Sequence, residues 1–146
     1  CWLWTGDRVF LEEMYLFCKQ GVLDYTLGHC DPDGDLCPSG RSVIETLEMH
    51  AGFECIDSAT YTWEALGRLI DLAQAMGDIA IIPELEAKAA ILAQRIQQEW
   101  WIEAEGLFAD VRATVEEVKA ALLRIDGMGA NQPGDQGDDG PDHEEA

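Results

Sequence analysis

The chain has 146 residues, of which 47% are hydrophobic, and its formal net charge is −20 at pH 7. This length and apolar content suit one domain with a hydrophobic core. The charge argues against nucleic acid and anionic membranes as partners, because both are bound through clustered Lys and Arg, whereas the 9 basic residues here are scattered. The sequence has neither an apolar run long enough to span a membrane nor a signal-peptide pattern.

The 5 cysteines form no CxxC pair, and no histidine stands at zinc-finger spacing from them. Neither a disulfide framework nor a structural zinc site is therefore expected, and a reducing, cytoplasmic location fits. Because the first residue is Cys1 and not Met, we also expect this chain to be part of a longer protein.

Helical spacing of apolar residues begins close to the N-terminus. A first helix is expected over residues 7–27, with Gly28 as its stop. A second helix is expected from about Asp57 to Met76, with Gly77 as its C-terminal cap. Its predicted apolar face consists of Trp63, Leu66, Ile70 and Ala73.

A third helix is expected to begin with Pro83 in its first turn and to be broken by Glu105-Gly106. Its apolar stripe is Leu85, Ala89, Leu92, Ile96 and Trp100. Residues 107–111 form an extended link, and Thr114-Val-Glu-Glu117 has the form of a capping box for a last helix to about Ile125. No strand pattern of any length competes, so the predicted fold class is all-α.

The C-terminal segment loses its large apolar residues. Residues 127–146 are acidic, contain no Lys or Arg, and are predicted to be a disordered tail after a helical domain over residues 1–126. The simplest interpretation of this tail is a solubilising end, and a specific metal or protein partner is the alternative.

A long acidic connection joins the first two predicted helices, and structureless connections of this length usually carry function. Its segment Asp31-Pro-Asp-Gly-Asp35 places the carboxylates of Asp31, Asp33 and Asp35 at alternate positions around a glycine. Such spacing gathers oxygen ligands for a hard cation such as calcium, although the EF-hand pattern fails further along the loop. The alternative is an Asx-type turn, in which the Asp side chains accept backbone N–H groups.

Three segments together resemble a known family. They are Trp4-Thr-Gly-Asp-Arg-Val-Phe-Leu-Glu-Glu-Met-Tyr15, Asp31-Pro-Asp-Gly-Asp-Leu-Cys-Pro38 and Ile56-Asp-Ser-Ala-Thr-Tyr-Thr-Trp-Glu-Ala-Leu66. They resemble six-hairpin glycosidases, the (α/α)6-toroid glycoside hydrolases that include glycogen-debranching and acid β-glucosidase types. The resemblance covers residues 2 to about 113 and leaves out the tail.

The resemblance implies helical hairpins that form part of an (α/α)6 toroid, and hydrolysis of glycosidic bonds in a carbohydrate substrate. In the β-glucosidase type, an Asp-Gly-Asp-Gly-Leu-Pro turn leads to a catalytic acid seven positions after the Pro, which from Pro38 is Glu45. This sequence departs from that pattern twice, with Glu45 where the family has Asp and Leu36 where it has the second Gly.

The chemistry of glycoside hydrolysis agrees with this assignment. One carboxyl group must stay protonated to donate to the leaving oxygen, and a second serves as nucleophile or as base. Glu45 lies between Ile44 and Leu47, and an apolar environment would raise its pKa. Without the resemblance, Glu45 would be an ordinary exposed loop carboxylate. Other carboxylates near it in the sequence are Glu48, Glu54 and Asp57, and Asp57 is equally suited to cap the second helix.

Further residues are candidates for substrate binding. Trp63 could stack on a sugar ring, His50 could hydrogen-bond a hydroxyl, and Arg41 could hold the loop carboxylates in place. Two of them have a structural alternative: a core position for Trp63 and a buried, satisfied histidine for His50. With these we group Glu48 as a substrate-binding candidate.

The chain is too short to be a whole toroid. Twelve helices with their loops need well over about 300 residues, against about four helices predicted here. We therefore expect a partial domain that is inactive alone and needs the remaining hairpins of a longer parent chain. Apart from calcium, no cofactor is expected. The alternative is a non-catalytic helical module that binds carbohydrate or protein.

Overall fold

The computed structural model describes residues 2–40 and 53–129. The chain is predominantly helical, which confirms the all-α prediction at that level. The elements in chain order are α1 (Trp2–Thr5), α2 (Arg8–Gln20), the π-helix η1 (Gly21–Thr26), β1 (Ser39–Gly40), β2 (Phe53–Cys55), α3 (Ile56–Met76), the 3-10 helix η3 (Ile79–Ile81), α4 (Ile82–Glu99), β3 (Trp101–Ile102), β4 (Leu107–Phe108), β5 (Val111–Arg112) and α5 (Val115–Gly129).

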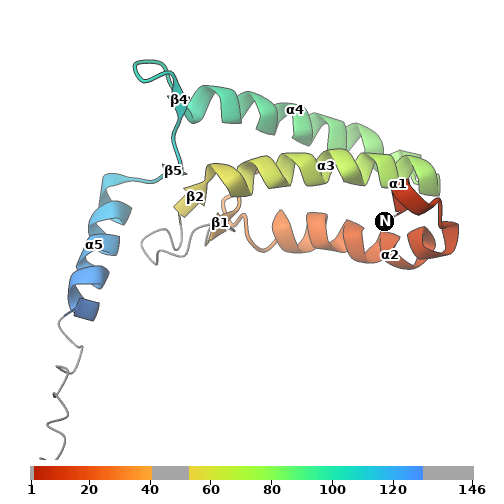
Figure 1. Cartoon of the computed structure of the whole chain (residues 1–146), viewed down its shortest axis with the longest axis horizontal. Coiled ribbons are helices and arrows are strands. Elements are labelled where there is room, and N and C mark those ends of the chain that lie inside the picture. The colour runs from red at the N-terminus through yellow and green to blue at the C-terminus, as the bar shows by residue number, and fades with distance from the viewer. Residues whose placement is uncertain (1, 41–52, 130–146) are drawn as a thin grey trace, which may run out of the picture.

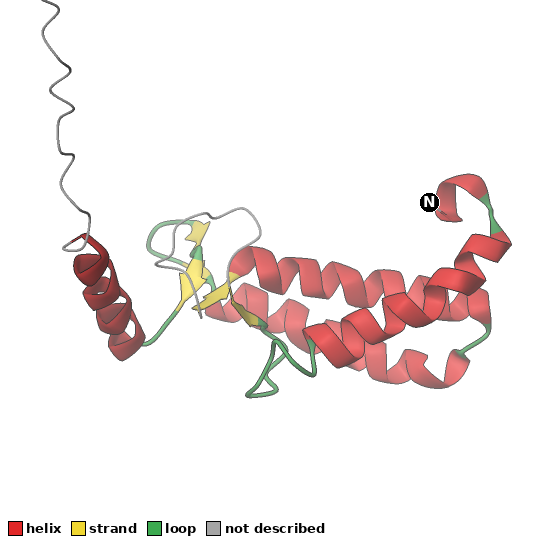
Figure 2. Cartoon of the chain, turned by 90° about the horizontal axis from the view of Figure 1, so that it is seen from below, coloured by secondary structure: helices red, strands yellow, loops and turns green. Residues whose placement is uncertain are grey.

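Helices α2, α3 and α4 form one layer. Figure 1 shows α3 between α2 and α4, with the short strands β1, β2 and β5 gathered at one end of the layer. Helix α5 leaves this end and extends away from the layer, as the view from below also shows (Figure 2). Among the described helices, none is both long enough and apolar enough to cross a membrane.

Helix α2 together with η1 begins and ends close to the predicted positions. Asp7 is its N-cap, and its carboxylate accepts a hydrogen bond of 3.0 Å from the N–H of Phe10. The helix then widens into η1, where the N–H of Leu27 donates to the carbonyl of Val22 over 3.0 Å. The helix expected over residues 7–27 is thus confirmed, with a π-helical last part.

The C-terminal cap of α3 was predicted correctly and its N-terminal cap was not. Gly77 has a left-handed φ of 77°, as a C-terminal cap requires. Asp57 is not the N-cap, because β2 runs directly into the helix and Cys55 takes that position. The Asp57 carboxylate lies in the first turn, where it accepts a 2.7 Å hydrogen bond from the N–H of Ser58.

The core lies between α3 and its two neighbours. On α4 the predicted stripe is confirmed, since Leu85, Leu92 and Trp100 are fully buried. On α3 the predicted Leu66 and Ala73 are buried, whereas Trp63 is 44% exposed. The buried core cluster is Leu36, Cys37, Ala59, Leu66, Leu69, Leu85, Leu92 and Trp100.

The described part of the chain also contains short strands, for which the sequence has no pattern. A small antiparallel sheet has the order β1-β2-β5, with Gly40 opposite Phe53 and Cys55 opposite Val111. Helix α4 ends at Glu99, and a β3–β4 hairpin occupies the residues between it and β5. These strands are two or three residues long, so they show no alternation of apolar and polar residues that a sequence could reveal.

The capping box before α5 is confirmed. The N–H of Glu117 donates to Thr114 Oγ1 over 3.2 Å, and the N–H of Thr114 donates to Glu117 Oε2 over 2.7 Å. The helix continues to Gly129, beyond the expected end at Ile125. Residues 130–146, which include most of the predicted tail, lie outside the described residues.

Candidate functional site

The acidic turn after the first helix is organised by Asp31. Its Oδ1 accepts the N–H groups of Gly34 and Asp35, both over 3.1 Å, and its Oδ2 accepts that of Leu36 over 2.8 Å. The residue is only 4% exposed. This arrangement confirms the predicted Asx-type turn. Burial raises the pKa of Asp31, and a side-chain hydrogen bond with Asp33 adds to this effect.

Two positions of this turn have left-handed backbone. Gly34 has a φ of 75°, and Leu36 has a φ of 74°. Among the described residues, Leu36 is the only non-glycine with positive φ. Its side chain is nonetheless buried in the core, at 9% exposure. A leucine in this conformation is strained by about 1–2 kcal/mol, so the fold here demands a backbone that suits glycine.

Asp35 connects the turn to distant parts of the chain. Its Oδ2 lies 2.7 Å from Arg95 Nη2 on α4 and 2.6 Å from Arg112 Nη2 on β5. Its Oδ1 accepts the N–H of Cys37 over 2.8 Å. Burial alone would raise the pKa of Asp35, but the hydrogen bonds from Arg95, the Cys37 N–H and Arg112 outweigh burial and hold this pKa below its usual value.

Arg112 has two carboxylate partners besides Asp35. It is also ion-paired with Glu54 on β2 and with Glu99 at the end of α4. The guanidinium carbon lies 5.0 Å from the ring centroid of the fully buried Trp100. Arg95 joins the same group through Glu99, with Nε and Oε1 2.7 Å apart. We call Asp35, Glu54, Arg95, Glu99 and Arg112 the arginine cluster.

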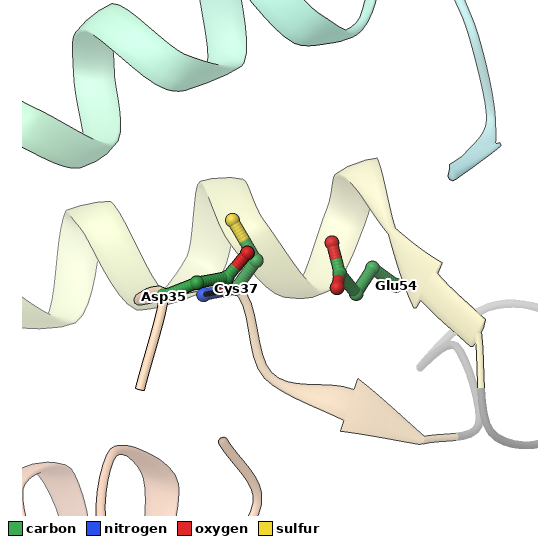
Figure 3. Close-up of side chains that lie close together, drawn as sticks. All are labelled: Asp35, Cys37 and Glu54. Atoms are coloured by element: carbon green, nitrogen blue, oxygen red, sulfur yellow. Dashed lines mark hydrogen bonds between the residues drawn. The ribbon is translucent and has the colours of Figure 1, made fainter. Parts of the chain in front are cut away.

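Two ionisable groups at this position, Glu54 and Cys37, have a raised pKa, which favours their neutral forms. Figure 3 shows the side chains of Asp35, Cys37 and Glu54 close together beside the first turns of α3. Burial raises the pKa of Glu54 despite its ion pair with Arg112. Burial, with Asp35 nearby, raises the pKa of the Cys37 thiol to about 12. Cys37 is therefore a protonated core thiol and not a nucleophile.

Most of the residues predicted from the sequence to bind or react with substrate lie outside the described part of the chain. These residues are Arg41, Glu45, Glu48 and His50. The described strands next to them in the sequence, β1 and β2, pair with each other at Gly40 and Phe53. Both flanks of this segment therefore lie at the sheet, and the arginine cluster holds Glu54 at one of them.

Trp63, the remaining predicted substrate-binding residue, is not part of the arginine cluster. It lines an apolar pocket of about 360 Å³ between α3 and α4, together with Ile56, Thr60, Ala93, Ile96, Gln97 and Phe108. Phe108, at 44% exposure, is as accessible as Trp63. Phe108 was expected only as part of an extended link, and its edge contact with Trp101, with ring centroids 5.1 Å apart, depends on the β3–β4 hairpin.

Sequence reasoning did not identify Arg95, Glu99 and Arg112 as parts of a site. The spacing of four between Arg95 and Glu99 on one helix was a local signal for their pairing. Arg112 offered none, because its partner Asp35 is 77 positions away. Glu54 was named only as one nearby carboxylate among several.

The described residues contain two groups whose ligand atoms lie within 4.8 Å of one another. One is the predicted calcium set, Asp31, Asp33 and Asp35, and the other consists of Asp35, Cys37 and Glu54. The oxygens of Asp31 and Asp35 already accept backbone N–H groups, and two guanidinium groups lie beside Asp35. A cation would have to compete with these donors. The predicted calcium site is not tested by these contacts, but they favour the Asx-type turn over it.

Comparison with known proteins gives no assignment. The sequence matches no protein-family model and no curated protein.

Proposed function

We propose that this chain is part of a glycoside hydrolase domain of the six-hairpin type. Its parent protein would hydrolyse glycosidic bonds in carbohydrate by carboxylate acid/base catalysis, with Glu45 as the general acid. The chain itself would supply helical hairpins of an (α/α)6 toroid and would be inactive without the remaining hairpins and a second carboxylate.

The observation that carries this proposal is the backbone at Gly34 and Leu36. In the Asp-Gly-Asp-Gly turn of the family, glycines occupy both positions. Here the second position holds Leu36, yet its φ of 74° matches the 75° of Gly34. A leucine that retains a glycine conformation is expected where the turn geometry is kept and only the residue has changed. The positive φ at Leu36 supports the proposal, because it is the conformation that a glycine at this position would adopt freely.

The arginine cluster gives this turn a further role. Arg112 binds Asp35, which precedes β1, and Glu54, which belongs to β2. The segment that contains Glu45 therefore follows β1 and precedes β2, and one guanidinium group contacts a residue on each side of it. A catalytic group must be positioned to within about 0.5 Å, and a rigid base of this kind serves that need.

The other predicted residues take supporting roles in this proposal. Arg41, Glu48 and His50 are candidates for contacts with sugar hydroxyls and the reacting carboxylates. Trp63 would be a stacking surface for a sugar ring at a distance from the reaction. The proposal also includes a cytoplasmic location, which the free thiols of Cys18, Cys30 and Cys37 support.

The test uses the longest natural open reading frame that includes these residues. Glu45→Gln should lower turnover of alkyl or sugar glycosides by about 10²–10⁴-fold, because proton donation to the leaving oxygen is lost. Dinitrophenyl glycosides have a leaving group that needs no proton, so their cleavage should largely survive in the variant. Glu64→Gln, on the exposed side of α3, is the control for expression and folding. Full turnover of alkyl glycosides by Glu45→Gln would remove this residue from the mechanism.

A non-catalytic carbohydrate-binding module is the second candidate. The specific observation in its favour is the pocket with Trp63 and Phe108 on its walls and the polar side chains of Thr60 and Gln97 within reach. Calorimetric titration of the 146-residue chain with oligosaccharides, with Trp63→Ala as the variant, tests it. Binding that depends on Trp63, in an otherwise inactive parent, would favour this candidate over the enzyme.

A further inference from the structure

One side of α2 and η1 has no neighbour in the described structure. It carries four large apolar side chains, and Val9 is 64% exposed, Leu16 60%, Phe17 69% and Tyr25 63%. Between these side chains lie polar or acidic residues on the same side of the helix. We call the whole set the outer face of α2: Val9, Glu13, Leu16, Phe17, Gln20, Asp24 and Tyr25.

The opposite side of the helix accounts for its attachment to the rest of the fold. Leu11 is buried, and Tyr15 and Val22 pack against the core. Tyr15 Oη and Lys19 Nζ both donate to Asp78 Oδ2 at the end of α3, each over 2.7 Å. Because α2 is anchored in this way at the edge of the layer (Figure 1), its outer face is free to receive a partner without disturbing the core.

The π-helical part of this segment shapes the outer face. A pocket lies over the junction of α2 and η1 and is lined by Phe17, Gln20, Gly21, Asp24 and Tyr25. It places two exposed aromatic rings around the side-chain-free position of Gly21. Interruptions of this kind in α-helices are frequent at functional sites. The pocket gives the outer face an open recess that two aromatic side chains help to line.

The charges on the outer face indicate which kind of partner would fit it. Glu13 and Asp24 are carboxylates on the outer face, and neither forms an ion pair with any described residue. The two cations of the same helix are engaged elsewhere, Arg8 with Glu12 and the carbonyl of Ala75, and Lys19 with Asp78. The outer face thus presents apolar surface with negative charge and no positive charge.

We propose that the outer face of α2 binds an amphipathic helix of another protein, one whose apolar stripe is flanked by Lys or Arg. Helix-in-groove recognition of this kind buries the apolar stripe and pairs the flanking charges. A second copy of this chain is a poor occupant, because a net charge of −20 and an acidic face oppose self-association. The face is about 25 Å long, which suits a partner helix of about 15 residues. The proposal is argued from this face alone, and the remaining hairpins of the proposed parent chain are the competing occupant.

Two synthetic helices provide the probe. Both are about 15 residues long with the same stripe of Leu and Phe, and they differ only in flanking residues, Lys in one and Glu in the other. We expect the 146-residue chain to bind the Lys-flanked helix, measured by fluorescence anisotropy, and to bind the Glu-flanked helix at least about tenfold more weakly. Higher salt should reduce this preference.

Variants of the chain show whether the Lys-flanked helix binds at the outer face of α2. Phe17→Glu should weaken binding of the Lys-flanked helix by about tenfold or more, while Ile91→Glu, at a position 52% exposed on α4, should not. The double variant Glu13→Lys and Asp24→Lys should reverse the preference towards the Glu-flanked helix. Circular dichroism confirms that each variant is folded before it is scored. Equal binding of both helices, no binding, or loss of binding only with Ile91→Glu would overturn the proposal. So would a dimer in solution that Phe17→Glu dissociates, because the occupant would then be a second copy.

Discussion

Arg112 Nη2 lies 2.6 Å from Asp35 Oδ2, although the two residues are 77 positions apart in the sequence. This contact joins β5 to the acidic turn, and through Glu54 and Glu99 the same guanidinium group reaches β2 and α4. Four segments of the chain therefore meet at one side chain. The arginine cluster is the point at which the small sheet is fastened to the helical layer.

Removal of this guanidinium group should destabilise the fold. Arg112→Ala leaves Asp35, Glu54 and Glu99 with Arg95 as their remaining cation in the cluster, and it uncovers the ring of Trp100. We expect a loss of about 2–3 kcal/mol in the free energy of unfolding, measured by urea denaturation, because uncompensated carboxylates remain at a half-buried position.

Two matched variants separate the causes of that loss. Arg112→Lys keeps the positive charge but not the forked geometry and should fall between wild type and Arg112→Ala. Arg68→Ala removes an exposed arginine that pairs with Glu64 and Asp71 on α3, and it should cost less than about 1 kcal/mol. Equal effects of Arg112→Ala and Arg68→Ala would contradict the role given to the cluster.

Glu54 and Asp35 should respond to pH in opposite directions. Burial raises the pKa of Glu54 in the folded chain above its unfolded value of about 4.3. The folded state then holds a proton that the unfolded state has released, so stability from Glu54 is lost as pH rises through this window. Glu54→Gln abolishes this loss. The Tm of Glu54→Gln minus that of wild type should therefore increase as pH rises from about 4.

The contribution of Asp35 to stability depends on pH with the opposite sign. Its pKa is lowered in the folded state, so its contribution to stability is present above the unfolded pKa of about 3.9 and is lost as pH falls through the folded pKa. The Tm deficit of Asp35→Asn should shrink as pH falls. Thermal melts between about pH 3 and 7 test both variants, and slopes of the same sign would contradict the assignment.

The features predictable from the sequence were those set by interactions within a few residues or by a period that repeats along one helix. Gly77 and the Thr114 and Glu117 pair were identified because each cap acts within a few residues. The apolar stripe of α4 was identified because its period repeats over the length of the helix. Strands of two residues carry no period, and Asp57 lost its predicted capping role because β2 places Cys55 at that position. The N-terminal boundary of α3 was thus set by sheet pairing.

The candidate site was predictable only in part for a related reason. The Asp31 turn follows from side-chain bonds to neighbouring N–H groups, so its sequence pattern was sufficient. The arginine cluster depends on the path of the chain through α3 and α4. Until that path is known, Arg112 is one scattered cation in an acidic chain.

Calcium provides a direct test of the acidic turn. The oxygens of Asp31 and Asp35 already accept hydrogen bonds from backbone N–H groups, and Arg95 and Arg112 lie beside Asp35. We therefore expect millimolar calcium to leave the Tm unchanged, since a ligand stabilises only the state that binds it. A rise in Tm that Asp33→Asn abolishes would establish the turn as a calcium site. Magnesium at the same concentration is the control for ionic strength.

Substitutions at Leu36 should separate backbone strain from burial. Leu36→Ala and Leu36→Gly both remove a buried side chain, and each should cost about 2–4 kcal/mol in the free energy of unfolding. They differ in that Gly adopts the observed φ of 74° freely, whereas Ala does not. In an ordinary helix or strand the glycine variant would be the less stable of the two. Here we expect Leu36→Gly to be more stable than Leu36→Ala by about 1 kcal/mol.

Gly34→Ala is the matched variant at the other left-handed position of the turn. With a φ of 75° and open space around an added Cβ, it should lower the free energy of unfolding by about 1 kcal/mol from backbone conformation alone. Urea denaturation of the three variants measures these differences, and a Leu36→Ala variant at least as stable as Leu36→Gly would show that this position does not require a glycine-like backbone.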